Sequence, residues 1–376
     1  MKLYILAGEA SGDSRGAELM RALRERIPGV QFLGAGGPQM KALAGDAIFD
    51  WADEAVVGLW DVLKKYGYFR AQLARMLAEI ERELPDALIT VDYPGFNLRL
   101  ARAAKARIPG LRTIHYVSPQ VWAWNRGRIP KMAKYLDLML CLFPVEVPMY
   151  EKARLPAVCT GHPLLDTLAE KKRPDYVRDP NLVALLPGSR AKEVRKIFPI
   201  MLHAALHLRI ARQRLRFEAA AASEPLAEEM RALLRTHGLD ETACPITLGN
   251  ANDLMQRAAA GMVCSGTATL EATYFGLPMV ILYKVAWLTW AIGKRLVKIP
   301  FLGLPNVLAG REIIREFLQT DAKPEVIAND LILLLEHEPV RTAQQAAQAQ
   351  VIATLGERGA AKRAAEAIAE AIENPV

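Results

Sequence analysis

The chain has 376 residues, 52% of them apolar and 24% charged, which is the balance of a globular protein, and its length favours two domains over one core. The net charge of +7 suits anionic partners such as nucleic acid, nucleotide sugars or the inner leaflet of a membrane, without choosing among them. Its four cysteines are widely spaced and form no C-x-x-C pair, which excludes a disulfide framework and a zinc site and indicates a reduced cytosolic protein.

Strand-like and helical stretches alternate through the first half of the chain. Short, mostly apolar runs predict strands at residues 3–7, 31–34, 86–91, 112–117 and 138–142. Helical composition and periodicity predict helices at residues 14–27, 68–84 and 98–107. Because strands separated by helices form parallel sheets covered on both faces, we expect an α/β domain. The first strand starts at once, so we expect no signal peptide before the fold.

The second half repeats this alternation. Its predicted strands are residues 182–186, 217–222, 261–264 and 278–283. Its predicted helices start near residue 193 and cover residues 252–258, 267–275, 324–337 and the tail from 342. The charged, proline-rich stretch 163–180 is the predicted linker, and the predicted domains are 1–165, 166–340 and a helical tail at 341–376. The mostly apolar stretch 272–293 is interrupted by Gly276 and Pro278, so no membrane-spanning helix is expected there.

A strand followed by a small-residue loop that opens a helix occurs in each half. The loop GEASGD (8–13) follows the first strand, and PGSR (187–190) follows the strand at 182–186. Such a loop presents free backbone N–H groups and the positive end of a helix dipole, which suit a phosphate. Neither loop has the G-x-x-x-x-G-K-[ST] or G-x-G-x-x-G pattern, which argues against ATP hydrolysis and NAD binding. The repeat predicts two nucleotide-type domains with a cleft between them.

Several residues that follow predicted strands of the first half are candidates for chemistry, because ligands bind at the carboxyl ends of parallel strands. Asp92, before a Pro-Gly turn, is either a general base or the cap of the next helix. Trp122 and Trp124 either wall a sugar or acyl site or anchor the domain. His115 lies within a strand, where a core histidine is the favoured interpretation.

The second half offers candidates for binding an anion and a sugar. Arg190 either meets a developing diphosphate charge or is a surface arginine on a tight turn. Thr267 and Thr269 offer hydroxyls to phosphate and Glu271 offers an acceptor to ribose, unless this segment is only a helix cap. Asn306 either reads a base or hydroxyl or is part of a turn.

The segment at residues 56–66 is densely apolar and ends near the lysine pair Lys64 and Lys65. It is either a buried helix or a helix that dips into a membrane interface with its lysines at the headgroups.

Taken in chain order, the motifs resemble those of the lipid-A-disaccharide synthase family. They are GEASGD (8–13), DYPGFN (92–97), IHYVSPQVWAW (114–124), GHP (161–163), LLPGSR (185–190), SGTATLE (265–271) and the segment from KRLVK to LPNVLAGRE (294–312). The resemblance runs from residue 1 to about 320. IHYVSPQVWAW and LPNVLAGRE are specific to the family, whereas many nucleotide-sugar enzymes share the glycine-serine loops.

The resemblance implies a GT-B glycosyltransferase with two Rossmann-like domains facing each other across a cleft. Enzymes of this kind join UDP-2,3-diacylglucosamine to 2,3-diacylglucosamine 1-phosphate, giving the β-1,6-linked lipid A disaccharide 1-phosphate and UDP. Forming a β bond from an α-linked donor inverts the anomeric centre, so a base must act on the face opposite UDP. No Asp-x-Asp motif supports a bound metal, and no cofactor is expected.

The resemblance also implies a role for each matched residue. Asp92 would be the base, and Arg190 would support the leaving diphosphate. The UDP-sugar contacts would be Gly188, Ser189, Arg190, Gly266, Thr267, Glu271 and Asn306. The acceptor contacts would be Gly8, Ser11, Gly12, Asp13, Asn97, Ser118, Gln120 and Trp124. The membrane-facing residues would be Val57, Leu59, Trp60, Leu63, Lys64 and Lys65.

The partners implied are the two acylated substrates, the cytoplasmic face of the inner membrane and a second copy of the chain, with C-terminal parts exchanged and no nucleic acid. The nearest alternative is another GT-B enzyme acting on UDP-N-acetylglucosamine, either a lipid-linked glycosyltransferase or a 2-epimerase. A nonenzymatic basic protein that binds membranes or nucleic acid is the alternative from another class, and it predicts salt-sensitive binding to vesicles or RNA.

Overall fold

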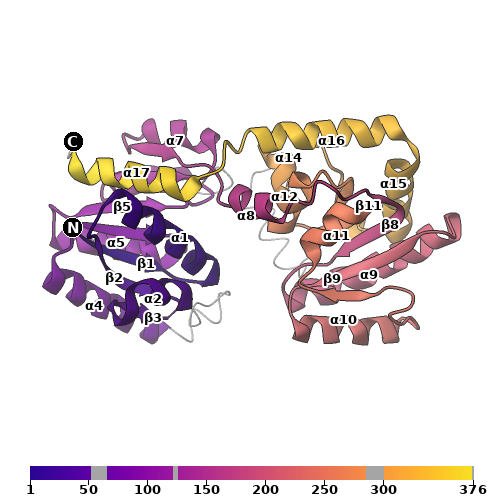
Figure 1. Ribbon diagram of the computed structural model, residues 1–376, viewed down its shortest axis with the longest axis horizontal. Coiled ribbons are helices and arrows are strands. Elements are labelled where there is room, and N and C mark those ends of the chain that lie inside the picture. The colour runs from indigo at the N-terminus through magenta and orange to yellow at the C-terminus, as the bar shows by residue number, and fades with distance from the viewer. Residues whose placement is uncertain (52–65, 122–125, 285–299, 375–376) are drawn as a thin grey trace. The chain divides into compact units, whose positions relative to one another are not determined.

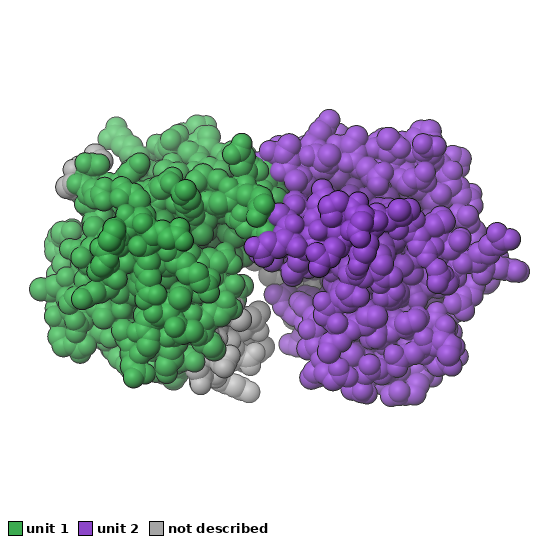
Figure 2. All heavy atoms as spheres, in the orientation of Figure 1, with its two compact units in different colours: residues 1–166, 355–376 green, residues 167–354 purple. Residues whose placement is uncertain are grey.

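The structure is a computed structural model that describes residues 1–51, 66–121, 126–284 and 300–374. The chain divides into two compact units, which Figure 2 colours separately. Unit 1 comprises Met1–Asp166 and Leu355–Val376, and unit 2 comprises Thr167–Thr354. Each unit has a parallel sheet with helices packed against it (Figure 1), which confirms the predicted pair of α/β domains.

Seven parallel strands form the sheet of unit 1, in the order β3-β2-β1-β4-β5-β6-β7. They are β1 (Lys2–Ala7), β2 (Gln31–Gly36), β3 (Ile48–Asp50), β4 (Ala87–Val91), β5 (Arg112–Tyr116), β6 (Leu138–Cys141) and β7 (Ala157–Cys159). This is the strand order of Rossmann-type domains. The central strand β4 is buried along its whole length, as expected of a strand covered on both faces.

Eight helices belong wholly or partly to the described part of unit 1. They are α1 (Ala10–Arg26), α2 (Pro38–Ala44), α4 (Tyr66–Glu83), α5 (Pro94–Arg107), α6 (Ile129–Met132), α7 (Val147–Glu151), α8 (Leu164–Lys171) and α17 (Ala360–Glu373). Short 3-10 turns occur at Gly45–Ala47, Arg126–Arg128 and Pro144–Glu146. Trp51 anchors the core: its side chain is fully buried, and its indole N–H donates to the carbonyl of Ala7 at 2.7 Å.

The sheet of unit 2 has six parallel strands in the order β10-β9-β8-β11-β12-β13. They are β8 (Asp179–Leu186), β9 (Arg216–Ala221), β10 (Ile246–Leu248), β11 (Ala258–Cys264), β12 (Met279–Tyr283) and β13 (Glu316–Leu318). Numbered from its own first strand, unit 2 therefore has the order 3-2-1-4-5-6, which the first six strands of unit 1 also have.

Helices also cover the sheet of unit 2, and a core around Phe198 and Phe217 lies beneath them. They are α9 (Ala191–Ala211), α10 (Glu224–Thr236), α11 (Ala251–Arg257), α12 (Thr267–Tyr274), α14 (Leu304–Ala309), α15 (Pro324–Glu336) and α16 (Glu338–Ala353), with a 3-10 turn at Gln319–Asp321. Glutamines fix α16 to this unit, since the Gln344 amide donates to the carbonyl of Met279 at 3.1 Å and accepts from its N–H at 2.8 Å.

The two C-terminal helices belong to different units. While α16 packs on α12 in unit 2, α17 packs on α1 in unit 1. Buried alanines and Ile368 form the packed face of α17. At one end of this contact, Arg26 of α1 pairs with Glu373 of α17 at 3.1 Å.

Three predicted helix starts are four residues too late, and two of them lie at the candidate loops. The third is that of α16, which begins at Glu338 rather than residue 342. Helix α1 begins at Ala10 rather than residue 14, and α5 begins at Pro94 rather than residue 98. Pro94 is suited to the first turn because proline lacks the N–H that would be unbonded there. The short strands β3, β7, β10 and β13 were missed, because three residues are too few for a period to be read. None of the described helices is long and apolar enough to cross a membrane.

Candidate active site

Both sheets have a topological switch point, where consecutive connections leave on opposite sides of the first strand. It lies between β1 and β4 in unit 1 and between β8 and β11 in unit 2. Ligands of such sheets bind outside the carboxyl ends of the strands at this point. The motifs at 8–13 and 92–97 follow the two strands in unit 1, and those at 187–190 and 265–271 follow the two strands in unit 2.

A pocket of about 350 Å³ lies at the switch point of unit 2. It brings together six of the seven residues predicted to contact the UDP-sugar, namely Gly188, Ser189, Arg190, Gly266, Thr267 and Glu271. Further lining residues, which were assigned no role from the sequence, are Leu186, Glu193, Ala220, Ala221, Ala222, Gly249, Ala251, Met255, Cys264, Ser265 and Ala268. Residues separated by more than 80 positions thus form a single pocket.

Two glycines that line this pocket have backbone conformations that other residues rarely adopt. Gly188 has a φ of +111°, and a Cβ there would lie 2.7 Å from a carboxylate oxygen of Glu193 and 3.3 Å from the sulfur of Cys264. Gly266 has a φ of +154° and directly precedes α12. Both positions therefore require glycine, and the backbone N–H groups that begin α9 and α12 adjoin the pocket. The N-terminal ends of two helices at one pocket favour an anion.

The pocket carries one cation and two carboxyl groups. Arg190 is exposed, and its guanidinium pairs with Glu193 one turn later at 2.9 Å. Burial raises the pKa of Glu271, while nearby Lys171 opposes this rise. An arginine beside helix N-termini suits a diphosphate, and a carboxyl group deeper in the pocket suits sugar hydroxyls.

Asn306 does not line the pocket, although the sequence analysis grouped it with the UDP contacts. Its side chain is fully buried. Its amide nitrogen donates to the carbonyl of Ile314 at 2.6 Å and to Glu316 at 2.8 Å, and its oxygen accepts from the N–H groups of Ile313 and Ile314. These four bonds use the whole capacity of the amide, so Asn306 holds its own loop rather than offering a contact to a ligand.

Thr269 is also engaged within the fold. Its hydroxyl donates to the carbonyl of Gly266 at 2.7 Å, and the side chain is fully buried. Thr267 at the start of α12 is exposed and lines the pocket. Of these two threonines, it is therefore the one whose hydroxyl can reach a ligand.

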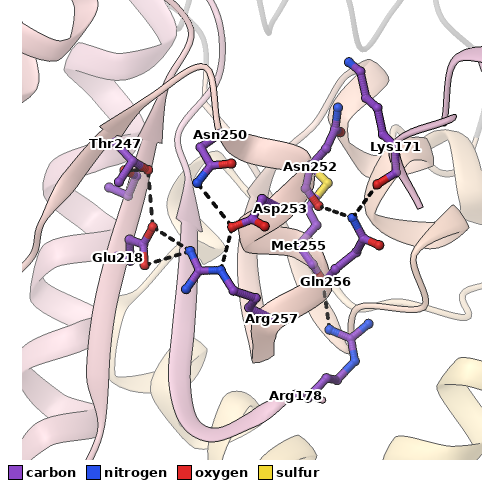
Figure 3. A network of polar contacts seen from close by, with 11 residues as sticks. Lys171, Arg178, Glu218, Thr247, Asn250, Asn252, Asp253, Met255, Gln256 and Arg257 are labelled. Carbon is purple, nitrogen blue, oxygen red and sulfur yellow. Dashed lines mark hydrogen bonds and ion pairs between the residues drawn. The ribbon is translucent and has the colours of Figure 1, made fainter. Parts of the chain in front are cut away.

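A network of polar contacts holds α11 against the pocket (Figure 3). Arg257 at the end of this helix pairs with Asp253 at 2.6 Å and with Glu218 of β9 at 3.0 Å. The guanidinium of Arg178 donates to the carbonyls of Met255 and Ala258 at 2.8 and 2.6 Å, and burial lowers its pKa to about 10. The network fixes the helix that contributes Met255 to the pocket wall.

The switch point of unit 1 is marked by strained backbone. Asp92, Tyr93 and Val117, which follow β4 and β5, have φ values of 53°, 44° and 73°. Left-handed φ is costly for residues other than glycine, above all for β-branched valine, and such strain persists where the surroundings hold it. Strain of this kind is concentrated at functional sites.

Asp92 is oriented by two contacts, one to each carboxylate oxygen. Its carboxylate accepts from the N–H of Tyr93 at 2.9 Å and forms an ion pair with Arg15 of α1. Helix α5 begins at Pro94, with Tyr93 as its N-cap residue, and Asp92 makes no bond to an N–H of the helix. The geometry therefore disfavours the capping interpretation of Asp92.

Arg15 pairs with Asp92, and the charge of Arg15 also reaches His162; neither residue was assigned a role from the sequence. Burial, with a contribution from the charge of Arg15, lowers the pKa of His162 to about 4. The N–H of Leu164 donates to Nδ1 of His162 at 3.1 Å. Arg15 lies one turn beyond the loop at 8–13, and a parallel sheet brings that turn close to the end of β4. The position of Arg15 could therefore have been found from the strand order of such a sheet.

Asp13 is a structural residue rather than a free contact for an acceptor. Its carboxylate accepts from the N–H groups of Gly37, Gln39 and Met40 at 2.9 to 3.0 Å, and the side chain is buried. These N–H groups lie at the start of α2, so Asp13 caps that helix from a distant part of the chain.

The other residues of the same loop are packed closely or exposed. A Cβ at Gly8 would collide with the ring of Tyr93, and one at Gly12 would lie 3.5 Å from the carbonyl of Val91. Gly8 therefore lets the start of α1 approach the turn after β4, whereas a Cβ at Gly12 would make only ordinary contacts. Ser11 is exposed, and its hydroxyl donates to Glu9 at 3.0 Å.

The remaining predicted acceptor residues lie in different environments. Asn97 is fully buried and its amide donates to the carbonyls of Val91 and Asp92 at 3.0 and 2.7 Å, so it supports the strained turn. Ser118 is buried and Gln120 is exposed. His115 is a core residue, as expected: its Nδ1 lies 2.7 Å from the Thr90 hydroxyl, and burial lowers its pKa to about 3.

Some predicted residues lie outside the described part of the chain. These are Trp122 and Trp124 and the membrane-facing set Val57, Leu59, Trp60, Leu63, Lys64 and Lys65. Within the described ranges, no group of three His, Cys, Asp or Glu side chains comes together as a metal site requires.

Comparison with known families and sequences gives a consistent result. The family model described as lipid-A-disaccharide synthetase matches residues 3–372. The lipid-A-disaccharide synthase of Trichlorobacter lovleyi is 38% identical over 379 residues, covering 99% of this chain and 98% of the relative. That of Pseudomonas aeruginosa strain UCBPP-PA14 is 38% identical over 382 residues, with coverage of 99% and 98%.

Solved structures resemble the fold at low sequence identity. The UDP-GlcNAc 2-epimerase of Neisseria meningitidis, bound to UDP-GlcNAc, has a TM-score of 0.59 at 12% identity and covers 99% of this chain and 100% of its own. MurG of Acinetobacter baumannii has a TM-score of 0.56 at 13% identity, with coverage of 98% and 99%. These neighbours confirm the predicted GT-B class of fold.

Proposed function

The chain belongs to the lipid-A-disaccharide synthase family, and on this premise we propose how its two units divide the reaction. The protein is a glycosyltransferase of lipid A synthesis. The reaction joins UDP-2,3-diacylglucosamine to 2,3-diacylglucosamine 1-phosphate through a β-1,6 bond and releases UDP.

Unit 2 binds the UDP part of the donor in this proposal. The single observation that carries it is the pocket at the switch point, which gathers six of the seven predicted residues. The N–H groups that begin α9 and α12 receive the diphosphate, and Arg190 balances the negative charge that grows as UDP leaves. Thr267 adds a hydroxyl donor, and Glu271 accepts from the hydroxyls of a sugar. Asn306 contributes by fixing the loop at 303–316.

Unit 1 supplies the base. Asp92 removes the proton of the acceptor 6-hydroxyl as that oxygen attacks the anomeric carbon, and the bond from this carbon to the diphosphate breaks. The backbone strain at Asp92 and its ion pair with Arg15 support this assignment, because both hold a carboxylate in one orientation. Arg15 is thus a positioning residue.

The acceptor is held by the loops around this base. We retain Gly8, Ser11, Gly12, Ser118, Gln120 and Trp124 as proposed acceptor contacts. Asp13 and Asn97 support these loops through their buried hydrogen bonds.

The proposed setting is the cytoplasmic face of the inner membrane. Both substrates carry acyl chains, so unit 1 must reach the bilayer, and the apolar segment with Val57, Leu59, Trp60 and Leu63 and the pair Lys64 and Lys65 make that contact. The proposal includes a homodimer in which C-terminal parts are exchanged. The glycines at 356 and 359, both with positive φ, precede α17 and allow the chain to redirect it to a partner.

A UDP-release assay with each substrate omitted in turn tests the function. We expect release only when the diacylated donor and the diacylated acceptor 1-phosphate are both present. Turnover of free UDP-N-acetylglucosamine without an acceptor would indicate an epimerase instead.

For the membrane contact, replacing Val57, Leu59 and Leu63 by Ser should raise the soluble fraction without detergent. Loss of folding in that variant would restore the buried-helix interpretation of this segment. Light scattering of the wild-type chain tests the proposed dimer.

A further inference from the structure

A second pocket, unrelated to the nucleotide pocket, lies on unit 1 between α5 and the segment at 126–135. Its volume is about 590 Å³. It is lined by Pro94, Gly95, Leu98, Arg99, Arg102, Lys105, Ala106, Arg128, Lys131, Met132, Lys134 and Tyr135. We call it the basic pocket, because half of these residues are arginine or lysine and none is acidic. The cluster of basic residues at 126–134 in the sequence forms one side of it.

Most of the positive charge of the basic pocket is not balanced by neighbouring carboxylates. Lys105 is neutralised by Asp137, whose oxygen lies 2.8 Å from its ammonium nitrogen. The other five cations, Arg99, Arg102, Arg128, Lys131 and Lys134, form no ion pair with any carboxylate in the described ranges of the chain. Four of them are exposed, and Arg128 is half-buried. Holding five like charges together without an anion is unfavourable, so this arrangement favours binding one.

The positive charge extends to the floor of the basic pocket. Tyr135 is half-buried there, and burial raises the pKa of its hydroxyl while the charges of Arg128 and Arg102 lower it. The same floor contains the apolar side chains of Leu98 and Met132, both buried. The basic pocket thus combines an apolar base with a cationic rim.

The basic pocket also adjoins the proposed acceptor side. It includes Pro94 and Gly95, which begin α5 only two and three residues after Asp92. A molecule bound there lies on the unit that carries the proposed base. Because that base acts on an acylated sugar, the surface near it must meet the lipid phase in which the sugar is dissolved.

We propose that the basic pocket binds the phosphate headgroups of anionic phospholipids and holds unit 1 on a membrane surface. This inference deepens the peripheral attachment proposed above and rests on it. Arginines and lysines in groups of four to eight bind anionic lipid surfaces, and an apolar floor accommodates the glycerol end of a headgroup. The lining favours a headgroup over RNA, because RNA requires a track of cations with stacking aromatic side chains. Within the lining, Tyr135 is the sole aromatic residue and is half-buried.

Co-sedimentation of the full chain with vesicles tests the proposal. The probes are vesicles of phosphatidylcholine with phosphatidylglycerol and vesicles of phosphatidylcholine alone. The test variant replaces Arg99, Arg102, Lys131 and Lys134 with Gln. The matched control makes the same change at two exposed arginines and two exposed lysines elsewhere, Arg214, Arg235, Lys323 and Lys362. Both variants have the same net charge, so a general electrostatic effect would weaken their binding equally.

The wild-type chain should bind the anionic vesicles, and the binding should weaken as salt is added. The test variant should bind them at least about tenfold more weakly than the control, because each cation near the surface contributes about fivefold. A further variant, Arg99→Lys with Arg102→Lys, keeps the charge and should retain binding. This variant shows whether the weaker binding of the test variant comes from lost charge or from lost folding. Circular dichroism measures the folding of each variant in parallel.

Two results would overturn the assignment of the basic pocket to lipid headgroups. Both can be distinguished from a failure of the peripheral attachment on which the assignment rests. Equal binding by test variant and control would remove the basic pocket as the attachment site. Loss of RNA binding in the test variant, with vesicle binding intact, would assign the basic pocket to RNA. If the wild-type chain bound no anionic vesicles at all, the proposed peripheral attachment itself would fail.

Discussion

In unit 2 the loops after β8 and β11 leave a pocket that two glycines with positive φ help to line, whereas in unit 1 the loops after β1 and β4 are packed against each other. Gly8 in unit 1 accommodates the ring of Tyr93, and Asp13 is bonded to the start of α2. The strand order is the same in both units, so topology alone does not decide what a switch point does. One is suited to receive an anion on backbone N–H groups, and the other to hold a carboxylate.

Removing the carboxylate of unit 1 is expected to have the largest effect. Asp92→Asn should lower the rate of UDP release by about a thousandfold, because a positioned base typically contributes 10²–10⁴-fold. UDP binding, measured by calorimetry, should be unchanged if the units divide the reaction as proposed. Asp46→Asn, at an exposed carboxylate of the same unit, is the control. Substantial activity in Asp92→Asn would remove this residue as the base.

Acid should affect unit 1 through its two buried histidines. Burial lowers the pKa of His115 to about 3 and of His162 to about 4, so the folded protein keeps both neutral while the unfolded chain takes up protons below about pH 6.5. The free energy of unfolding should therefore fall as the pH drops from 6.5 towards 4. The slope approaches about 1.4 kcal/mol per pH unit for each histidine.

Urea unfolding at pH 7, 6 and 5 measures this slope. His162→Gln should lose the contribution of one histidine and show a shallower dependence than the wild type. Identical slopes in the two proteins would mean that His162 takes up its proton equally in the folded and unfolded states.

A substitution at Asn306 tests whether this residue stabilises the fold or contacts the ligand. Asn306→Ala should lower the free energy of unfolding by about 2 kcal/mol, because it leaves the buried N–H group of Ile314 and the partly buried N–H group of Ile313 unbonded. Denaturation by urea measures this, and Asn329→Ala at an exposed site of α15 is the control. A loss of UDP affinity with unchanged stability would instead make Asn306 a direct contact.

The smallest expected effect is at the exposed cation of unit 2. Arg190→Ala should weaken UDP binding about tenfold and slow UDP release, since a charge-assisted hydrogen bond is lost at a solvated site. Arg195→Ala, on α9 but outside the pocket lining, should leave UDP binding unchanged. An unchanged UDP affinity in Arg190→Ala would contradict the placement of the diphosphate beside α9.

The sequence predicted the parts of the site that are formed by residues close together in the chain. Each apolar strand followed by a glycine-serine loop was recognisable without its partner, and the structure brings Gly188 and Thr267 into one pocket. The ion pair between Arg15 and Asp92 joins residues that are 77 positions apart, and no local sequence pattern predicts it. The bonds that occupy Asn306 are equally hidden, because an isolated asparagine in a turn looks the same whether its amide is free or fully used.

The path of the chain through the two units has a consequence for its synthesis. Unit 2 is a continuous stretch, while unit 1 needs both the first 166 residues and the helix α17, which is made after the whole of unit 2. Domains generally fold as units while the chain emerges. Unit 2 can therefore complete its fold on the ribosome before unit 1 can, although unit 1 is begun first. Until α17 emerges, the surface of α1 that it covers is exposed to chaperones and to other nascent chains.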